Sequence, residues 1–135
     1  MKKIADLHAF ILSLDLVAAE QIDSYVDDLV IVPSGRPAPT AGQIIIAEKR
    51  YTATFNIERY PHGQISEDAL LAQIAAWLIE NDTTRTDPIE FPLIVDVHDA
   101  QTANLEFGIT FEEWILAAED VAGPITANGK QYALV

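Results

Sequence analysis

The sequence predicts a mixed α/β fold of the α+β kind, in which two main helices cover one face of a mostly antiparallel or mixed sheet and form a two-layer sandwich. Apolar residues recur at three- and four-residue spacing in residues 2–14 and 67–81, which is typical of helices with one apolar stripe. Apolar and polar residues alternate along residues 43–59, 91–98 and 105–112, which is typical of strands with one buried face. Stripes and faces of this kind are buried together when helices pack on a sheet.

The two helices have separate signals. The first is predicted over residues 2–14, with residues 16–23 adding a short helical turn, and its stripe consists of Ile4, Leu7, His8, Ile11 and Leu12. The second is predicted to run to about Asn81, because Ser66 can cap it and the acids Glu67 and Asp68 suit the positive end of a helix. Its stripe consists of Leu70, Leu71, Ile74, Trp77 and Leu78.

An edge strand followed by an arm is predicted before the long strand. Residues 25–32 are rich in β-branched side chains, but Asp27 and Asp28 are poor strand formers and indicate an edge or a bulge. Residues 33–42 contain three prolines and two glycines, a composition that resists both a helix and a central strand. We therefore expect an exposed loop or arm at residues 33–42.

The clearest strand signal lies in residues 43–59. Its apolar face is predicted to carry Ile45, Ala47, Tyr51, Ala53, Phe55 and Ile57, and its polar face Glu48, Arg50, Thr52, Thr54, Asn56 and Glu58. Residues 83–88 are expected to form a loop, and residues 99–102 to connect the two later strands as a hairpin. Asn128-Gly129 is preferred in type I′ turns because both central residues need positive φ, so a small terminal hairpin is expected.

Length and composition limit the class of protein. A chain of 135 residues predicts a single domain over residues 1–135. No apolar run approaches the roughly 20 residues that cross a bilayer, and no secretory signal is read at the N-terminus, so we expect a soluble protein of a cytoplasm. The lack of cysteine excludes disulfides and thiolate metal sites. A net charge of −13 disfavours direct nucleic-acid binding. We interpret this charge as a source of solubility rather than as a functional acidic face.

No catalytic, cofactor or metal site is predicted. Asp96, His98 and Asp99 form the one cluster that suggests a metal or a general acid and base. On a strand, however, Asp96 and His98 share the polar face while Asp99 points the other way, so a solvated face is the favoured interpretation. His8 is interpreted as a satisfied core histidine, and His62 as a turn residue. Trp77 and Trp114 are interpreted as core or rim packing rather than as binding platforms.

Cations interrupt the acidic sequence on and beside the long strand. Lys49, Arg50 and Arg59 are interpreted either as solvated charges with acidic partners across the strands or as contacts to an acidic patch on the next subunit, and we favour the second hypothesis. With Arg36 in the arm, these residues make up the predicted assembly interface.

The stretch Glu48-Lys49-Arg50-Tyr51-Thr52, followed by a helix with Ala75-Ala76-Trp77-Leu78 and ending in Glu80-Asn81, resembles the tail completion protein R family of contractile-tailed temperate phages. The resemblance covers most of the chain, is strongest over residues 48–81 and carries no catalytic signature. It implies a tail terminator-like fold and a minor, non-enzymatic virion protein. Longer members of the family have an additional C-terminal segment beyond the region that corresponds to this chain.

The resemblance also implies the role and the partners. Such a protein caps the tail tube, terminates tail length and prepares the tail for joining to the head, in the cytoplasm of the bacterial host and then in the virion tail. It acts as a homo-oligomeric ring, commonly a hexamer, that contacts tail tube, sheath and head-joining proteins. It needs no cofactor and contacts neither a membrane nor nucleic acid directly.

Two alternatives stay open: a small ferredoxin-like enzyme using Asp96 and His98, and an acidic protein-binding module that mimics nucleic acid.

Overall fold

The computed structural model describes residues 1–85 and 89–135, which form an antiparallel sheet and two helices. The elements are α1 (Lys2–Ser13), a 3₁₀ turn (Ala19–Gln21), β1 (Ile22–Pro37), β2 (Gln43–Tyr60), α2 (Glu67–Asn81), β3 (Leu93–Val97), β4 (Ala103–Glu119), β5 (Ile125–Ala127) and β6 (Lys130–Leu134). The sheet order is β1-β2-β4-β6-β5, and β3 also pairs with β4. The predicted α+β class is therefore confirmed.

The chain divides into two compact units. Unit 1 comprises Met1–Asp27 and Thr52–Phe111, and unit 2 comprises Asp28–Tyr51 and Glu112–Val135. The three long strands β1, β2 and β4 each contribute residues to both units, whereas both helices and β3 belong to unit 1 and the β5–β6 hairpin belongs to unit 2.

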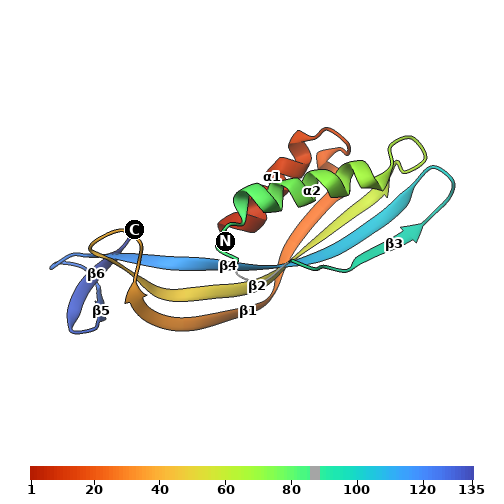
Figure 1. The fold of residues 1–135 in the computed structure, drawn as a ribbon. Helices are drawn as coiled ribbons and strands as arrows, with labels where there is room; N and C mark the ends of the chain where they lie inside the picture. The colour runs from red at the N-terminus through yellow and green to blue at the C-terminus, as the bar shows by residue number, and fades with distance from the viewer. Residues whose placement is uncertain (86–88) are drawn as a thin grey trace. The chain divides into compact units, whose positions relative to one another are not determined.

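Unit 1 contains a helix-covered core. Figure 1 shows α1 and α2 lying next to each other on one side of the strands of this unit. The stripe residues Leu7, Ile11, Leu70 and Ile74 are 0% exposed, and the Phe55 ring of β2 stacks on the Phe107 ring of β4 at 5.2 Å between centroids. The apolar face predicted for the long strand is confirmed at all six positions: Ile45, Ala47, Tyr51, Ala53, Phe55 and Ile57 are buried.

The helix ends also follow the sequence. The Ser66 hydroxyl accepts a hydrogen bond from the Asp68 amide at 3.2 Å, which confirms the predicted cap of α2.

His8 is half-buried, bonds to the Ser24 hydroxyl at 2.7 Å and lies against Phe55, so its interpretation as a satisfied histidine is confirmed. His62 lies in the turn after β2 and contacts the Asp99 carbonyl oxygen.

Unit 2 is a sheet without helices. Ile44, Ala117 and Tyr132 form its buried cluster, against which Ile46, Ile125 and Ala127 pack. The Asn128 side-chain amide donates a hydrogen bond to the Gly35 carbonyl oxygen at 2.9 Å, which brings the turn between β5 and β6 back to β1. This sheet is therefore nearly closed and barrel-like, so the single two-layer sandwich predicted for the whole chain was too simple. Both helices belong to unit 1 and lie on the strands of that unit.

Strand β1 is longer than predicted. It runs from Ile22 to Pro37, so the first half of the predicted arm is strand, while most residues of 33–42 are exposed as expected. Proline is tolerated here because β1 is the outermost strand of the sheet and has one unpaired edge. Asp28 has φ 53°, which agrees with the irregularity predicted at Asp27 and Asp28.

Both predicted hairpins are present. Strands β3 and β4 pair antiparallel in the register Leu93↔Phe107, Val95↔Leu105 and Val97↔Ala103. Strands β5 and β6 pair around Asn128 and Gly129, whose φ values of 51° and 75° are those a type I′ turn requires. The loop predicted over residues 83–88 is described only as far as Arg85, because residues 86–88 lie outside the described residues. Neither helix in the described ranges is long and apolar enough to span a membrane.

Candidate assembly surfaces

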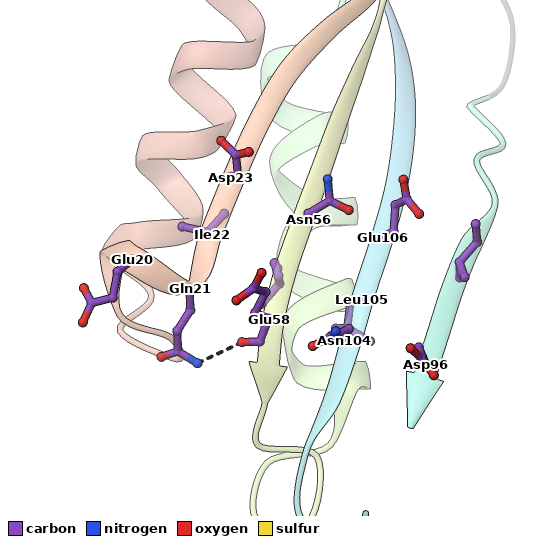
Figure 2. A pocket seen from close by; sticks show the side chains of 12 residues that line it. Glu20, Gln21, Ile22, Asp23, Asn56, Glu58, Asp96, Asn104, Leu105 and Glu106 are labelled. Carbon is purple, nitrogen blue, oxygen red and sulfur yellow. Dashed lines mark hydrogen bonds between the residues drawn. The ribbon is translucent and has the colours of Figure 1, made fainter. Parts of the chain in front are cut away.

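An acidic groove lies in unit 1, on the sheet face opposite the buried face. It has a volume of about 420 Å³, and Figure 2 shows its side chains coming from the 3₁₀ turn and from β1, β2, β3 and β4. Five carboxylates line it, together with three side-chain amides: Glu20, Asp23, Glu58, Asp96 and Glu106, with Gln21, Asn56 and Asn104. Among the described residues no Lys, Arg or His side chain lines this groove, so its electrostatic potential is negative.

Side-chain amides hold the backbone at one end of the groove. The Gln21 amide donates to the carbonyl oxygens of Glu58 at 3.0 Å and Arg59 at 3.3 Å. The side-chain oxygen of Asn104, on the neighbouring strand β4, accepts a hydrogen bond from the Arg59 backbone amide at 3.0 Å. Arg59 itself has φ 53° and is exposed, so these bonds keep the end of β2 in a conformation that a residue with a side chain rarely adopts.

The cluster of Asp96, His98 and Asp99 does not form a joint site. Asp96 lines the acidic groove, whereas Asp99 caps the β3–β4 turn by accepting from the amides of Gln101 and Thr102, both at 2.8 Å. These two backbone bonds lower the pKa of the Asp99 carboxyl. Within the described ranges, no three His, Asp or Glu side chains gather as ligands for a metal ion.

A ladder of charges crosses β1, β2 and β4 in unit 2. The Glu48 carboxylate is paired with Arg36 at 2.6 Å and with Arg50 at 3.2 Å, and Arg50 also reaches Glu112 at 3.6 Å. The Arg36 guanidinium lies 5.9 Å from the centre of the Trp114 ring. Glu48 is buried, and the hydrogen bond from Arg36 lowers the pKa of its carboxyl, with Arg50 acting in the same direction and burial opposing it.

The four predicted interface cations lie in different settings. Arg36 and Arg50 belong to the ladder and are about half exposed, at 53% and 50% of their side chains. Lys49 is half-buried in unit 2, Arg59 is exposed in unit 1, and neither forms an ion pair with a residue that the structure describes. The chain has eight Lys and Arg residues, and six of them form ion pairs with described residues: Lys2, Lys3, Arg36, Arg50, Arg85 and Lys130.

Sequence reasoning missed two parts of these surfaces. It placed Glu48 and Arg50 on one polar face, but it did not predict that Glu48 is buried between two guanidinium groups. It also interpreted Trp114, which lies beyond the strand predicted over residues 105–112, as core or rim packing, whereas Trp114 lies inside β4 beside Arg36. A cross-strand pair of Arg36 and Glu48 could have been found only if residues 33–37 had been assigned to a strand that pairs with residues 43–59.

Comparisons with known proteins give one family and one phage relative. The family model described as P2 phage tail completion protein R (GpR) matches residues 1–134. A protein of Haemophilus phage HP1 (strain HP1c1), the "Uncharacterized 19.2 kDa protein in rep-hol intergenic region", is 34% identical over 113 residues, which cover 82% of this chain and 68% of that protein. No solved structure matches.

Proposed function

Because the chain belongs to the P2 phage tail completion protein R (GpR) family, we propose that it completes the phage tail by capping the tail tube, ending tail growth and preparing the tail for joining to the head. The observation that carries this proposal is the match of the family over residues 1–134. The protein does this work as a tail terminator-like single domain without catalysis. It joins the tail in the cytoplasm of the host and stays in the virion tail.

The proposed active form is a closed ring, for which we propose six copies. A ring needs one heterologous contact whose rotation closes, so each copy must carry two different complementary surfaces. The chain carries surfaces of opposite character: the acidic groove of unit 1 and the cations of unit 2. The tail tube, sheath and head-joining proteins are the proposed neighbours, and the net charge of −13 argues against direct contact with DNA.

Lys49, Arg50 and Arg36 of unit 2, together with Arg59 of unit 1, form the proposed cationic side of that ring contact, facing an acidic surface of the next copy. Lys49 supports this assignment because it forms no ion pair with a described residue, and Arg50 because half of its side chain is exposed. Arg36 and Arg50 are partly neutralised by Glu48, so Lys49 carries more of the available positive charge.

Tail completion is tested by infection. A phage or prophage whose copy of this gene is interrupted is expected to produce heads and tails that do not join, with tails of uneven length in negative-stain images. Supplying the wild-type chain from a plasmid should restore joined particles. Normal joined particles in the interrupted phage would contradict the proposed function.

The charge contact is tested by reversal and restoration. Lys49→Glu with Arg50→Glu should abolish rings of the purified protein, and Asp23→Lys with Asp96→Lys in the groove should do the same. All four changes in one chain should restore rings, because the charges are again opposite. The matched control is Lys130→Glu, at an exposed pair with Glu119, which should leave rings intact. Arg85→Glu is not a suitable control, because Arg85 pairs with the buried Asp82. Rings in both double variants would remove these residues from the contact.

One observation favours the acidic protein-binding module as a second candidate. Carboxylates that are scattered in the sequence gather on one continuous surface, the acidic groove. A module of this kind would hold a Lys- and Arg-rich surface of another protein, in a complex that weakens steeply with salt. Purified wild-type protein that binds a basic partner but never forms rings or restores joined particles would favour this candidate.

A further inference from the structure

A second groove lies between α1 and the outer edge of β1, within unit 1. It has a volume of about 450 Å³ and is lined mostly by apolar side chains of α1, including Ile4, Ala5, Ala9 and Leu12, and by Ser24 to Val26 of β1. The hydrogen bond between His8 and Ser24 ties the helix to the strand at this groove. No strand in the described ranges pairs with this edge of β1, because β1 is the end of the sheet order.

Strand β3 is the other edge of the sheet in unit 1, and its apolar side chains are poorly covered. Its register with β4 puts Leu93, Val95 and Val97 opposite Phe107, Leu105 and Ala103, each of which is 1% exposed, so this row faces the core side. Even so, Val95 is 46% and Val97 is 60% exposed. Leu93 is half-buried, so the poorly covered part of the row is Val95 and Val97, although an edge strand that exposes apolar residues is normally protected.

We propose that β3 of one copy adds to the free edge of β1 in the next copy, so that Val95 and Val97 enter the groove beside α1 of that copy. This proposal rests on the proposed ring. It gives the ring a heterologous contact, because the surface that one copy contributes differs from the surface that the next copy contributes. Backbone hydrogen bonds join the two sheets, and α1 of the next copy covers the row that β3 leaves exposed. The small side chains of Ala5 and Ala9 leave room for the incoming valines.

The area of this contact is that of one small contact within a larger assembly. Five paired residues on each strand bury on the order of a few hundred Å² in total, below the about 1,000 Å² of a specific interface that forms by itself. One such contact alone is weak. A closed ring stabilises it, because every copy then uses both of its edges.

Salt distinguishes this contact from the charge contact. Asp96 of β3 comes to lie on the same side of the joined sheet as Asp23 and Asp27 of the neighbouring β1, so like charges approach each other. Added salt screens this repulsion and should strengthen the strand contact, whereas it should weaken a contact made of opposite charges.

The most direct test is a disulfide between copies. The chain has no cysteine, so Ala9→Cys and Val97→Cys introduced together give two thiols and no others. Under mild oxidation the double variant should form a ladder of covalent oligomers on a non-reducing gel, and the two single variants should not. Mixing the two single variants should give the dimer alone.

Substitutions in the two surfaces test the contact without cysteine. Ala9→Lys and Val97→Lys should each lower the association constant at least about tenfold in sedimentation experiments, because they place an amine in the apolar groove. Lysine is chosen because it reduces the net negative charge, so general repulsion cannot explain a loss. Ala76→Lys, at an exposed position of α2, and Val121→Lys, at a residue 92% exposed, are the matched controls and should change little.

The outcomes separate this inference from the proposed function. Rings that persist in both lysine variants, with no ladder from the cysteine pair, would overturn the strand contact and leave the ring standing. A wild-type protein that does not associate even beside tail tubes would overturn the strand contact and the ring together. The infection experiment reports on tail completion in either case.

Discussion

Glu48 is joined to Arg36 across the neighbouring strands β2 and β1 by an ion pair of 2.6 Å, in which the Glu48 side chain is 9% exposed and the Arg36 side chain 53% exposed. A carboxylate so poorly hydrated depends on its partners, because charge removed from water must be compensated by hydrogen bonds. Arg36 also lies over Trp114, so a single guanidinium connects the first, second and third strands in the sheet order of unit 2.

Replacing Arg36 with Ala is expected to destabilise unit 2 by about 1–3 kcal/mol, since Glu48 keeps only Arg50 and the contact with Trp114 is lost. Urea unfolding followed by Trp114 fluorescence in a Trp77→Phe background measures this loss. Adding Glu48→Gln should recover part of it, because the neutral amide needs no cation. A double variant that is less stable than Arg36→Ala alone would argue against the pair as the cause.

Acid should remove the contribution of the Glu48 pair. The pKa of Glu48 is lowered in the folded protein from its ordinary value of 4.5, chiefly by the hydrogen bond from Arg36. The unfolded chain therefore binds a proton first as pH falls, so the stabilisation is complete above the ordinary pKa and is lost as pH falls through the folded pKa. The difference in unfolding free energy between wild type and Glu48→Gln should be constant from about pH 7 to 6 and shrink toward about pH 3. A difference that grows in acid would contradict this sign.

The sequence-based prediction was most accurate where one short-range pattern decided the structure. The period of three and four residues identified both helices, and the period of two identified the apolar face of β2, whose six predicted positions are all buried. Glu48 and Thr54, which alternation assigns to the polar face, are buried as well. The continuation of β1 through Pro33 to Pro37 was missed because proline composition indicates a loop, whereas an edge strand pairs on one side only. The second half of β4 lacks alternation, and its Ala117 is buried by Tyr132 of the terminal hairpin, which is a long-range contact.

The candidate surfaces were less accessible to sequence reasoning. The acids of the groove lie between positions 20 and 106, and only the order β1-β2-β4, with β3 beside β4, brings them together. The burial of Glu48 likewise depends on Arg36, which reaches it from the neighbouring strand. Alternation indicates which face a residue occupies, but it does not indicate which strand becomes the neighbour or how far a sheet curls.

Asp82 should be the most sensitive charged residue of unit 1. Its side chain is 1% exposed and is paired with Lys3 at 2.6 Å and with Arg85 at 2.9 Å, and Arg85 also donates to the Thr110 carbonyl oxygen. Asp82→Asn removes the carboxylate that pairs with both cations, whose side chains are each 17% exposed, and should cost about 3 kcal/mol. Trp77 fluorescence in a Trp114→Phe background follows the unfolding of unit 1.

The control for Asp82 is the exposed pair on α1. Asp6 pairs with Lys2, whose side chain is 82% exposed, so Asp6→Asn should change the unfolding free energy by less than about 0.5 kcal/mol. If both variants lose the same stability, burial does not explain the importance of Asp82.

Gly123 is expected to tolerate no side chain. A Cβ atom at this position would collide with the Tyr132 carbonyl group and lie 2.9 Å from the Ala133 nitrogen, which are backbone atoms of β6 and cannot rotate away. Gly123→Ala should therefore push β6 away and destabilise unit 2 by about 3 kcal/mol, through overpacking. Gly42→Ala is the matched control: Gly42 has φ +77° but nothing within 4 Å of its Cβ position, so only backbone strain of about 1 kcal/mol is expected. Urea unfolding followed by Trp114 fluorescence compares the two variants, and equal losses would show that the close approach of Gly123 to Tyr132 does not limit this position.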